Sequence, residues 1–210
     1  QLQKANIRIG QIHNAFISHN HTDHLLGMVW VVRYIAQEIN KERYSGCFSL
    51  YGHLKSLNAL QMICSLVLQP RQYKLIGERI LMCPIEHDVH LDIDGRHFHF
   101  FNIWSKKELQ HGFIVVLHDG QKLAFLGDEP YNKDNESIVR GSDIIMQEAY
   151  CLYSERDKFN PYPKSHGTVL DSCKNAQQLN AKTTILFHTE GRTPMDMRKQ
   201  LYTDEGKTAF

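Results

Sequence analysis

Short apolar runs alternate with amphipathic segments in the first part of the chain, which predicts alternating strands and helices. The apolar run over residues 12–18 has the length of a buried strand. Apolar residues then recur at helical spacing over residues 25–39, and the Lys41-Glu42-Arg43 segment before Gly46 ends that helix. A strand over residues 47–51 and a helix from His53 through Val67 follow. This order predicts an α/β (α+β) fold.

From residue 80 to residue 125 the pattern changes to short strands separated by turn residues, which predicts an antiparallel sheet. The segment 92–95, which ends in Asp-Gly, separates strands over residues 89–91 and 97–104. Asp119-Gly120 separates two further strands in the same way, over residues 113–117 and 123–126. The elements predicted after residue 126 are strands over 144–147 and 183–187, a helix over 168–180 capped by Thr168, and a terminal helix over 192–202 with Pro194 in its first turn.

Predicted strands repeatedly end in a residue that can bind a metal or transfer a proton. Strand ends that meet at one edge of a sheet are where α/β-type enzymes assemble sites from distant parts of the sequence. We therefore expect these residues to share one site. The strand ends are Ser18 into His19, Leu126 into Asp128, Gln147 into Glu148 and Phe187 into His188.

The segment His19-Asn20-His21-Thr22-Asp23-His24 holds the densest group of candidate ligands. His19 and His21 are two residues apart, so in an extended segment they project to the same side and can bind one metal. Asp23 and His24 follow where the chain turns, and can face a second metal. Imidazole and carboxylate ligands suit zinc, with manganese or iron as competitors. The segment predicts a dinuclear centre on a strand-to-helix loop; the alternative is a polar loop that binds metal loosely.

Composition and charge narrow the class of protein. With 210 residues, of which 42% are hydrophobic, the chain can bury a substantial core, and we expect a single domain over residues 1–210. The net charge of +1 provides no global basic field, so a nucleic-acid substrate would be held by a local patch or by the metals. The five cysteines are odd in number and lack CxxC spacing, which favours free thiols in a reducing cytoplasm.

Three motifs downstream of HNHTDH complete a recognisable series. They are Gln110-His111-Gly112-Phe113, Leu126-Gly127-Asp128 and Leu186-Phe187-His188. In this order the four motifs resemble those of the metallo-β-lactamase superfamily, over about residues 12–188. The resemblance implies a four-layer αββα sandwich. That fold opens with a β-hairpin that residues 1–11 are too short to form, so we expect this chain to lack the N-terminal hairpin and the domain to be N-terminally incomplete.

The resemblance also implies a ligand set for two divalent metal ions. His118 is an alternative to His111, but it lies at the Asp119-Gly120 turn and lacks the flanking glycine that lets backbone approach a metal, so we prefer His111. The implied ligands are His19, His21 and His111 for the first metal, Asp23, His24 and His188 for the second, and Asp128 as a bridge between them.

Two further motifs resemble the ribonuclease Z group of phosphodiesterases. They are Gln147-Glu148-Ala149-Tyr150 and Ser165-His166-Gly167-Thr168. The resemblance implies that His166 donates a proton to the leaving oxygen and that Glu148 orients His166. The chemistry is consistent, because a carboxylate bonded to one imidazole nitrogen fixes the tautomer and leaves the other nitrogen to act as an acid. The alternative is a surface pair without a catalytic role.

We therefore expect a dinuclear metal-dependent phosphodiesterase, similar to ribonuclease Z, that uses a metal-bridging hydroxide on a phosphodiester such as RNA. Asp23 would bind metal and help to orient the nucleophile. Members of the ribonuclease Z group are often homodimers, which makes a homodimer the candidate assembly. The alternatives are a hydrolase of the same fold that acts on a lactone, thioester or other non-phosphate ester, and a non-catalytic metal-binding module.

The chain departs from ribonuclease Z at three places. Gln147 replaces the histidine that begins the corresponding motif, and Glu129-Pro130 follows Asp128 where threonine is usual. No glycine- and proline-rich arm is found between Gly52 and His111. These departures leave transfer-RNA processing open. His97 and His99, which alternate with phenylalanines, are interpreted as the polar face of a strand.

Overall fold

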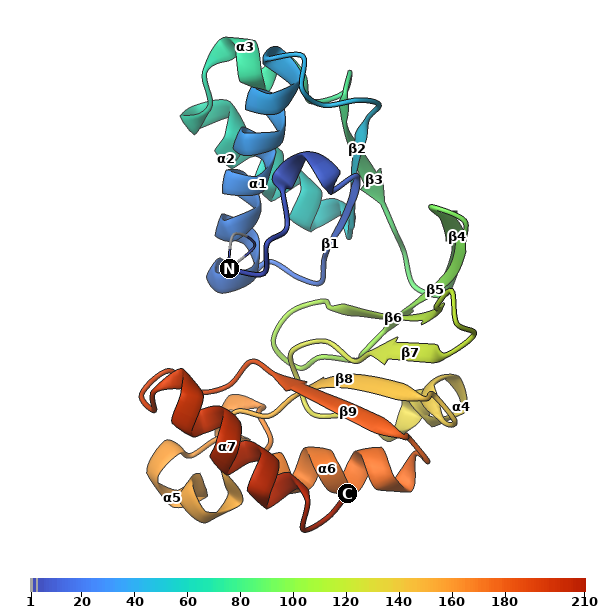
Figure 1. The fold of residues 1–210 in the computed structure, drawn as a ribbon, viewed down its shortest axis with the longest axis vertical. Coiled ribbons are helices and arrows are strands. Elements are labelled where there is room, and N and C mark those ends of the chain that lie inside the picture. The colour runs from blue at the N-terminus through green and yellow to red at the C-terminus, as the bar shows by residue number, and fades with distance from the viewer. Residues whose placement is uncertain (1, 3) are drawn as a thin grey trace. The chain divides into compact units, whose positions relative to one another are not determined.

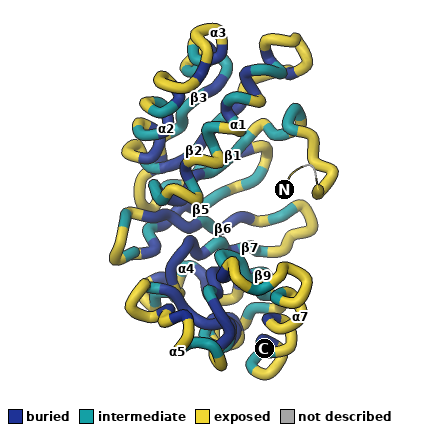
Figure 2. The backbone as a smooth tube through the Cα atoms, turned by 90° about the vertical axis from the view of Figure 1, so that its left-hand side faces the viewer, coloured by how far each residue is buried: buried dark blue, intermediate teal, exposed yellow. Residues whose placement is uncertain are grey.

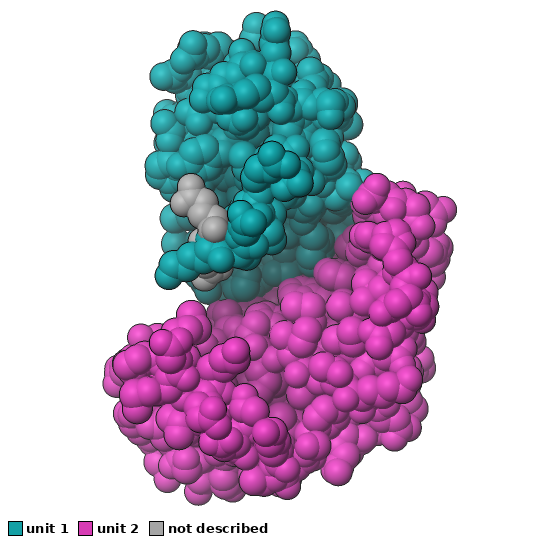
Figure 3. Space-filling view, in the orientation of Figure 1, with its two compact units in different colours: residues 1–86 teal, residues 87–210 magenta. Residues whose placement is uncertain are grey.

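The computed structural model describes residue 2 and residues 4–210, which form two compact units (Figure 3). The units comprise residues 1–86 and 87–210. Each contains one β-sheet with helices packed on it (Figure 1). The mixed α/β class predicted from the sequence is therefore confirmed. Of the helices formed by the described residues, none combines the length and apolarity that a membrane span needs.

The first unit is built on a three-stranded parallel sheet in the order β1-β2-β3. Parallel neighbours need long crossover connections, which the helices between the strands provide. Val32, Ile35 and Ala36 of the first helix are fully buried with Phe48 and Leu50 of the central strand. The elements are η1 (Ile9–Gln11), β1 (Asn14–Ile17), α1 (Thr22–Asn40), β2 (Phe48–Gly52), α2 (Leu54–Val67), α3 (Pro70–Tyr73) and β3 (Ile80–Pro84).

The second unit is built on a six-stranded sheet in the order β4-β5-β6-β7-β8-β9. The first four strands are antiparallel, whereas β8 runs parallel to both β7 and β9. The strands are β4 (Val89–Ile93), β5 (Arg96–Asn102), β6 (His111–Val116), β7 (Lys122–Phe125), β8 (Ile144–Glu148) and β9 (Thr183–Phe187). The helices are η2 (Lys133–Asn135), α4 (Glu136–Val139), η3 (Tyr153–Glu155), α5 (Arg156–Phe159), η4 (Tyr162–Lys164), α6 (Val169–Gln178) and α7 (Met195–Gly206).

The central strands of this sheet carry the buried core of the second unit (dark blue in Figure 2). Phe101, Ala124 and Ile145 are fully buried, and Leu179, which follows α6, packs with them. Aromatic rings from β6, β7 and β9 pack together on this sheet. The ring of Phe125 stacks on those of Phe113 and Phe187, with centroid distances of 5.3 Å in both cases. Because successive side chains point to opposite faces, this packing fixes the strand register.

The observed boundaries differ from the predicted ones where polar residues begin or end an element. Helix α1 begins at Thr22, with His21 as its N-cap, so Asp23 and His24 lie on its first turn and not on the preceding loop. Strand β6 begins at His111, and the terminal helix continues to Gly206. Apolar periodicity cannot locate such ends, because the deciding residues are not apolar.

Candidate metal and catalytic site

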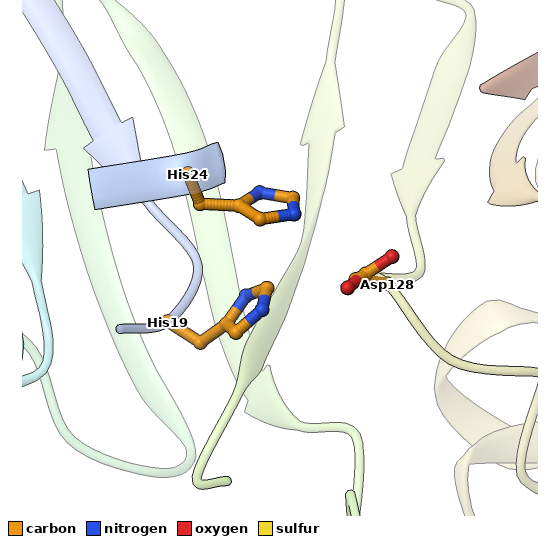
Figure 4. A group of neighbouring side chains, drawn as sticks. All are labelled: His19, His24 and Asp128. Carbon is orange, nitrogen blue, oxygen red and sulfur yellow. The ribbon is translucent and has the colours of Figure 1, made fainter. Parts of the chain in front are cut away.

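The first unit brings together three of the predicted histidine ligands at the end of β1. His19 is completely buried, and Ser18 Oγ lies 3.0 Å from its Nδ1. The Nε2 atom of His19 lies 2.9 Å from Nδ1 of His21. The His24 ring lies 4.2 Å from the His19 ring, centroid to centroid, and its Nε2 is 3.4 Å from Oδ2 of Asp23. Figure 4 shows His19 on the loop after β1 and His24 on the first turn of α1.

This cluster has the chemistry of a metal site. Core packing does not require several imidazole rings to lie this close to one another. Neutral imidazoles are, by contrast, preferred ligands of zinc. The Asp23 side chain is 63% exposed and so can reach a ligand outside the protein core. The residues of the first unit therefore fit the metal centre that the sequence predicts for them.

The second unit places Asp128 and His188 in contact. Asp128, also drawn in Figure 4, is buried on the loop that follows β7, and its Oδ1 lies 2.8 Å from Nδ1 of His188. The Asp128 amide donates a hydrogen bond to Oε1 of Gln110 at 3.2 Å. Gly127 precedes it with φ +75°, and a Cβ there would lie 2.7 Å from Cδ1 of Ile103. Glycine is therefore favoured at the turn that precedes Asp128, because its positive φ strains other residues and a Cβ would displace the end of the Ile103 side chain.

His111 is buried at the start of β6, opposite Asn102 of β5. A Cβ on the next residue, Gly112, would lie 2.5 Å from the backbone oxygen of Phe125. The glycine in this motif therefore permits close packing of β6 on β7. His118 lies at the exposed hairpin turn with Nε2 2.6 Å from a guanidinium nitrogen of Arg96, which favours His111 as the ligand.

Glu148 and His166 form a buried pair in the second unit. Oε2 of Glu148, the last residue of β8, lies 3.5 Å from Nδ1 of His166. Oε1 of Glu148 accepts a hydrogen bond from the Gly167 amide at 2.6 Å. Burial raises the pKa of Glu148, although the hydrogen bonds from His166 and Gly167 oppose this shift. The His166 ring stacks between those of Tyr150 and His188, at 5.2 and 5.0 Å.

The second unit therefore gathers three candidate residues at one edge of its sheet. Potential ligand atoms of Asp128, His166 and His188 all lie within 4.8 Å of one another. Strands β7, β8 and β9 are parallel, so the residues that follow or end them share an edge. Two of the three departures from ribonuclease Z, Gln147 and Glu129, also have structural roles in this unit. Gln147 is buried, and its Nε2 donates to the backbone oxygen of Ser172 at 2.8 Å.

Glu129, the second departure, anchors a loop that sequence reasoning did not connect to the site. Its carboxylate accepts hydrogen bonds from Ser105 Oγ at 2.6 Å and from the Lys106 amide at 3.2 Å. On the same loop, Nζ of Lys107 lies 3.1 Å from Nε2 of His166. Lys107 is therefore a candidate functional residue that the sequence did not predict. Its only sequence signal is its position on the loop before His111.

Comparison with known proteins identifies the family. The model of the family described as "Beta-lactamase superfamily domain" matches residues 2–189. The chain belongs to this superfamily. Of the predicted ligands, this superfamily member carries His19, His21, Asp23 and His24 in its first unit and His111, Asp128 and His188 in its second.

The curated relatives of this superfamily member include ribonuclease Z proteins, in agreement with the branch predicted from the sequence. Ribonuclease Z from Bacillus thuringiensis (strain Al Hakam) is 29% identical over 101 residues, which cover 45% of this chain and 32% of the relative. Ribonuclease Z from Anoxybacillus flavithermus is 29% identical over 98 residues, or 47% of this chain and 30% of that protein. The match thus spans about a third of the length of these relatives.

Solved structures confirm the fold of this superfamily member. The metallo-beta-lactamase fold protein YhfI from Bacillus subtilis has a TM-score of 0.75 at 13% identity, covering 99% of this chain and 76% of that one. The short form of human tRNase Z has a TM-score of 0.70 at 19% identity, covering 91% and 77% respectively. The predicted metallo-β-lactamase fold class is therefore confirmed.

Proposed function

We propose that this member of a hydrolase superfamily is a dinuclear metal-dependent phosphodiesterase, with residues 1–210 acting as a single metallo-β-lactamase-like domain. The Glu148–His166 pair carries the proposal. It places a buried carboxylate behind an imidazole that contacts the ring of the candidate ligand His188. An acid for the leaving group is needed when an alkoxide departs from phosphorus, and less so for activated esters.

Two divalent metals, zinc first and manganese or iron as alternatives, would be held by the ligands proposed from the family pattern. Two imidazole nitrogens 2.9 Å apart in the first unit, and an imidazole nitrogen 2.8 Å from a carboxylate oxygen in the second, support this assignment. When bound, the metals supply an activated water and neutralise negative charge on the phosphoryl oxygens. The proposed ligands are His19, His21 and His111 for one metal, Asp23, His24 and His188 for the other, and Asp128 for both.

His166 would donate a proton from Nε2 to the leaving oxygen. Glu148 faces Nδ1, the opposite ring nitrogen, so the carboxylate holds the tautomer and stabilises the charged ring. The ammonium group of Lys107 can only donate, so it bonds Nε2 while that nitrogen is unprotonated; once Nε2 carries a proton, the ammonium group would bind a phosphate oxygen instead. Asp23 would bind metal and orient the nucleophile. Each group thus has one task in an in-line displacement at phosphorus.

The proposed substrate is a phosphodiester, with RNA as the candidate class because curated relatives are ribonuclease Z proteins. We also propose a reducing cytoplasm as the location and a homodimer as the assembly. The five cysteines are all free thiols, which supports the first of these. Size measurement in solution tests the second.

Replacement of His166 by alanine tests the proposal. We expect His166→Ala to keep its metals and to lose about 10²- to 10⁴-fold in kcat on a dinucleotide diester, whose leaving group is an alkoxide. The loss should be smaller on bis(p-nitrophenyl) phosphate, because p-nitrophenolate leaves without protonation. His118→Ala, at an exposed turn of the same unit, is the matched control.

Metal content and both rates are measured on the same preparations. Wild-type activity of His166→Ala on the dinucleotide diester would overturn the assigned role. Hydrolysis of a lactone or a thioester by the wild-type protein, without hydrolysis of either phosphodiester, would instead favour the other ester hydrolases of this fold.

A further inference from the structure

A second group of histidines lies on the β4–β5 hairpin, apart in the sequence from every proposed catalytic residue. Asp94 and Gly95 form its turn with φ values of +52° and +70°. Two successive positive φ values are typical of a type I′ turn, which sets the strand register. That register pairs His90 with His99 and Asp92 with His97. These four side chains consequently share one face of the hairpin.

The donor atoms on this face lie at the distances expected of ligands to one ion. The rings of His90 and His99 are stacked, 4.1 Å apart and 11° from parallel. Nε2 of His99 lies 2.8 Å from Oδ1 of Asp88. Ligand atoms of Asp88, His90 and His99 all lie within 4.8 Å of one another. Ligands about 2.1 Å from a tetrahedral zinc ion lie about 3.4 Å apart, so small rotations of these side chains suffice.

His97 and Asp92 extend the cluster. Nε2 of His97 lies 3.1 Å from Nδ1 of His90, and Nδ1 of His97 lies 3.0 Å from Oδ1 of Asp92. A carboxylate bonded to one nitrogen of an imidazole orients the ring and makes its other nitrogen a better ligand. This arrangement leaves the Nε2 lone pair of His97 directed at the cluster, as a fourth ligand and third nitrogen or as a support for His90.

Packing does not account for this arrangement. Further along β5, on the same face, Phe101 is fully buried in the core, whereas the side chains of His97 and Asp88 are 59% and 68% exposed. Strand β4 is the first strand of the sheet, so the cluster lies at the sheet edge and within reach of ions in solution. Stacking of the exposed His90 ring on His99, whose side chain is 20% exposed, contributes little to the core. Imidazoles are, however, the commonest metal ligands.

We propose that Asp88, His90 and His99 bind one divalent transition-metal ion, with zinc as the first choice, in addition to the metals of the proposed catalytic centre. Two imidazole ligands disfavour the hard cations Mg²⁺ and Ca²⁺, which prefer oxygen. Binding displaces the proton shared by Asp88 and His99 and changes no oxidation state. The alternation of histidine and phenylalanine along β5, which indicated a polar strand face, thus also places His99 where it can bind the proposed metal.

The test counts zinc equivalents on the full chain. Protein stripped with a chelator is titrated with Zn²⁺ by calorimetry, and bound zinc is measured by mass spectrometry after desalting. We expect His90→Gln/His99→Gln to bind one equivalent less than the wild type. His118→Gln, an exposed histidine on another hairpin of the same unit, should bind as many equivalents as the wild type.

Two further measurements keep the result decisive. Equal melting temperatures of the metal-free wild type and double variant would show that the substitutions leave the fold intact. In the wild type, the side-chain NMR signals of His90 and His99 should shift on addition of the last equivalent. Equal zinc content of the wild type and a folded double variant would overturn the proposal. The outcome does not depend on phosphodiesterase activity, so failure of the proposed function would be recognised separately.

Discussion

Glu148→Gln changes one buried charge and almost nothing of the shape. In the wild type, Oε1 of Glu148 accepts the Gly167 amide hydrogen at 2.6 Å, and Oε2 faces Nδ1 of His166 at 3.5 Å. Glutamine can keep the first contact with its amide oxygen. Its NH₂ group then faces Nδ1, which must accept a hydrogen bond instead of donating one. The variant therefore disfavours the charged form of the His166 ring, which is the form proposed to donate the proton.

The size of the effect follows from the charge-assisted contact between Oε2 and Nδ1 that is lost, with the strength of a hydrogen bond as its upper limit. Hydrogen bonds to charged groups contribute about 1.5–3 kcal/mol, against about 0.5–1.5 kcal/mol for neutral ones. The difference of about 1–2 kcal/mol corresponds to roughly a 5- to 30-fold loss in kcat. We expect this loss on a dinucleotide diester and a smaller one on bis(p-nitrophenyl) phosphate.

Although Glu148→Gln should lower kcat, it should not lower the free energy of unfolding. Because burial raises the pKa of Glu148 in the folded protein, the ionised carboxylate destabilises the native state at neutral pH. That cost develops as the pH rises above the ordinary pKa of glutamate. The free energy of unfolding of Glu148→Gln at pH 7, measured in urea, should therefore equal or exceed that of the wild type. Glu136→Gln, on the surface, is the control for both measurements. If Glu148→Gln cleaved the dinucleotide diester with the kcat of the wild type, the proposed effect of the lost charge would be refuted.

Two further predictions concern the loop and turn that support the site. Lys107→Met removes the ammonium group 3.1 Å from His166 Nε2 and should lower kcat/KM by about tenfold. Lys106→Met, on the same loop, should have little effect. Steady-state kinetics of both variants at two salt concentrations tests this prediction. Gly127→Ala forces a side chain into a crowded position at positive φ and should destabilise the fold by about 1–3 kcal/mol. Gly141→Ala, at a similar φ of +73° but in open space, should cost less; equal melting temperatures would contradict the crowding argument.

The strands and the short ligand motifs could be predicted from the sequence because each is encoded by a few neighbouring residues. Helix α1 begins at Thr22, earlier than predicted, since Thr22, Asp23 and His24 carry no apolar periodicity. The contact between Lys107 and His166 could not be predicted for a different reason. It joins residues 59 positions apart through an irregular loop, and no spacing rule describes such a loop.

The histidine cluster on β4 and β5 shows the same limit. Alternation along β5 predicts that His97 and His99 share a face. The partner of each histidine across the hairpin depends on the two-residue turn at Asp94-Gly95, since a shift of one residue would move His90 to the opposite face. Sequence reasoning therefore found the face and missed the ligand set.

The parallel arrangement of β7, β8 and β9 separates the residues that fold the second unit from the proposed metal-binding and catalytic residues. Core side chains such as Ala124 and Ile145 lie within the strands, whereas Asp128 and His188 follow strand ends and His166 lies on a loop. Substitutions at the reactive positions should thus leave a folded scaffold. Inactive variants of this kind can be used to isolate from a cell extract a substrate of the proposed phosphodiester class, which they would bind without cleaving.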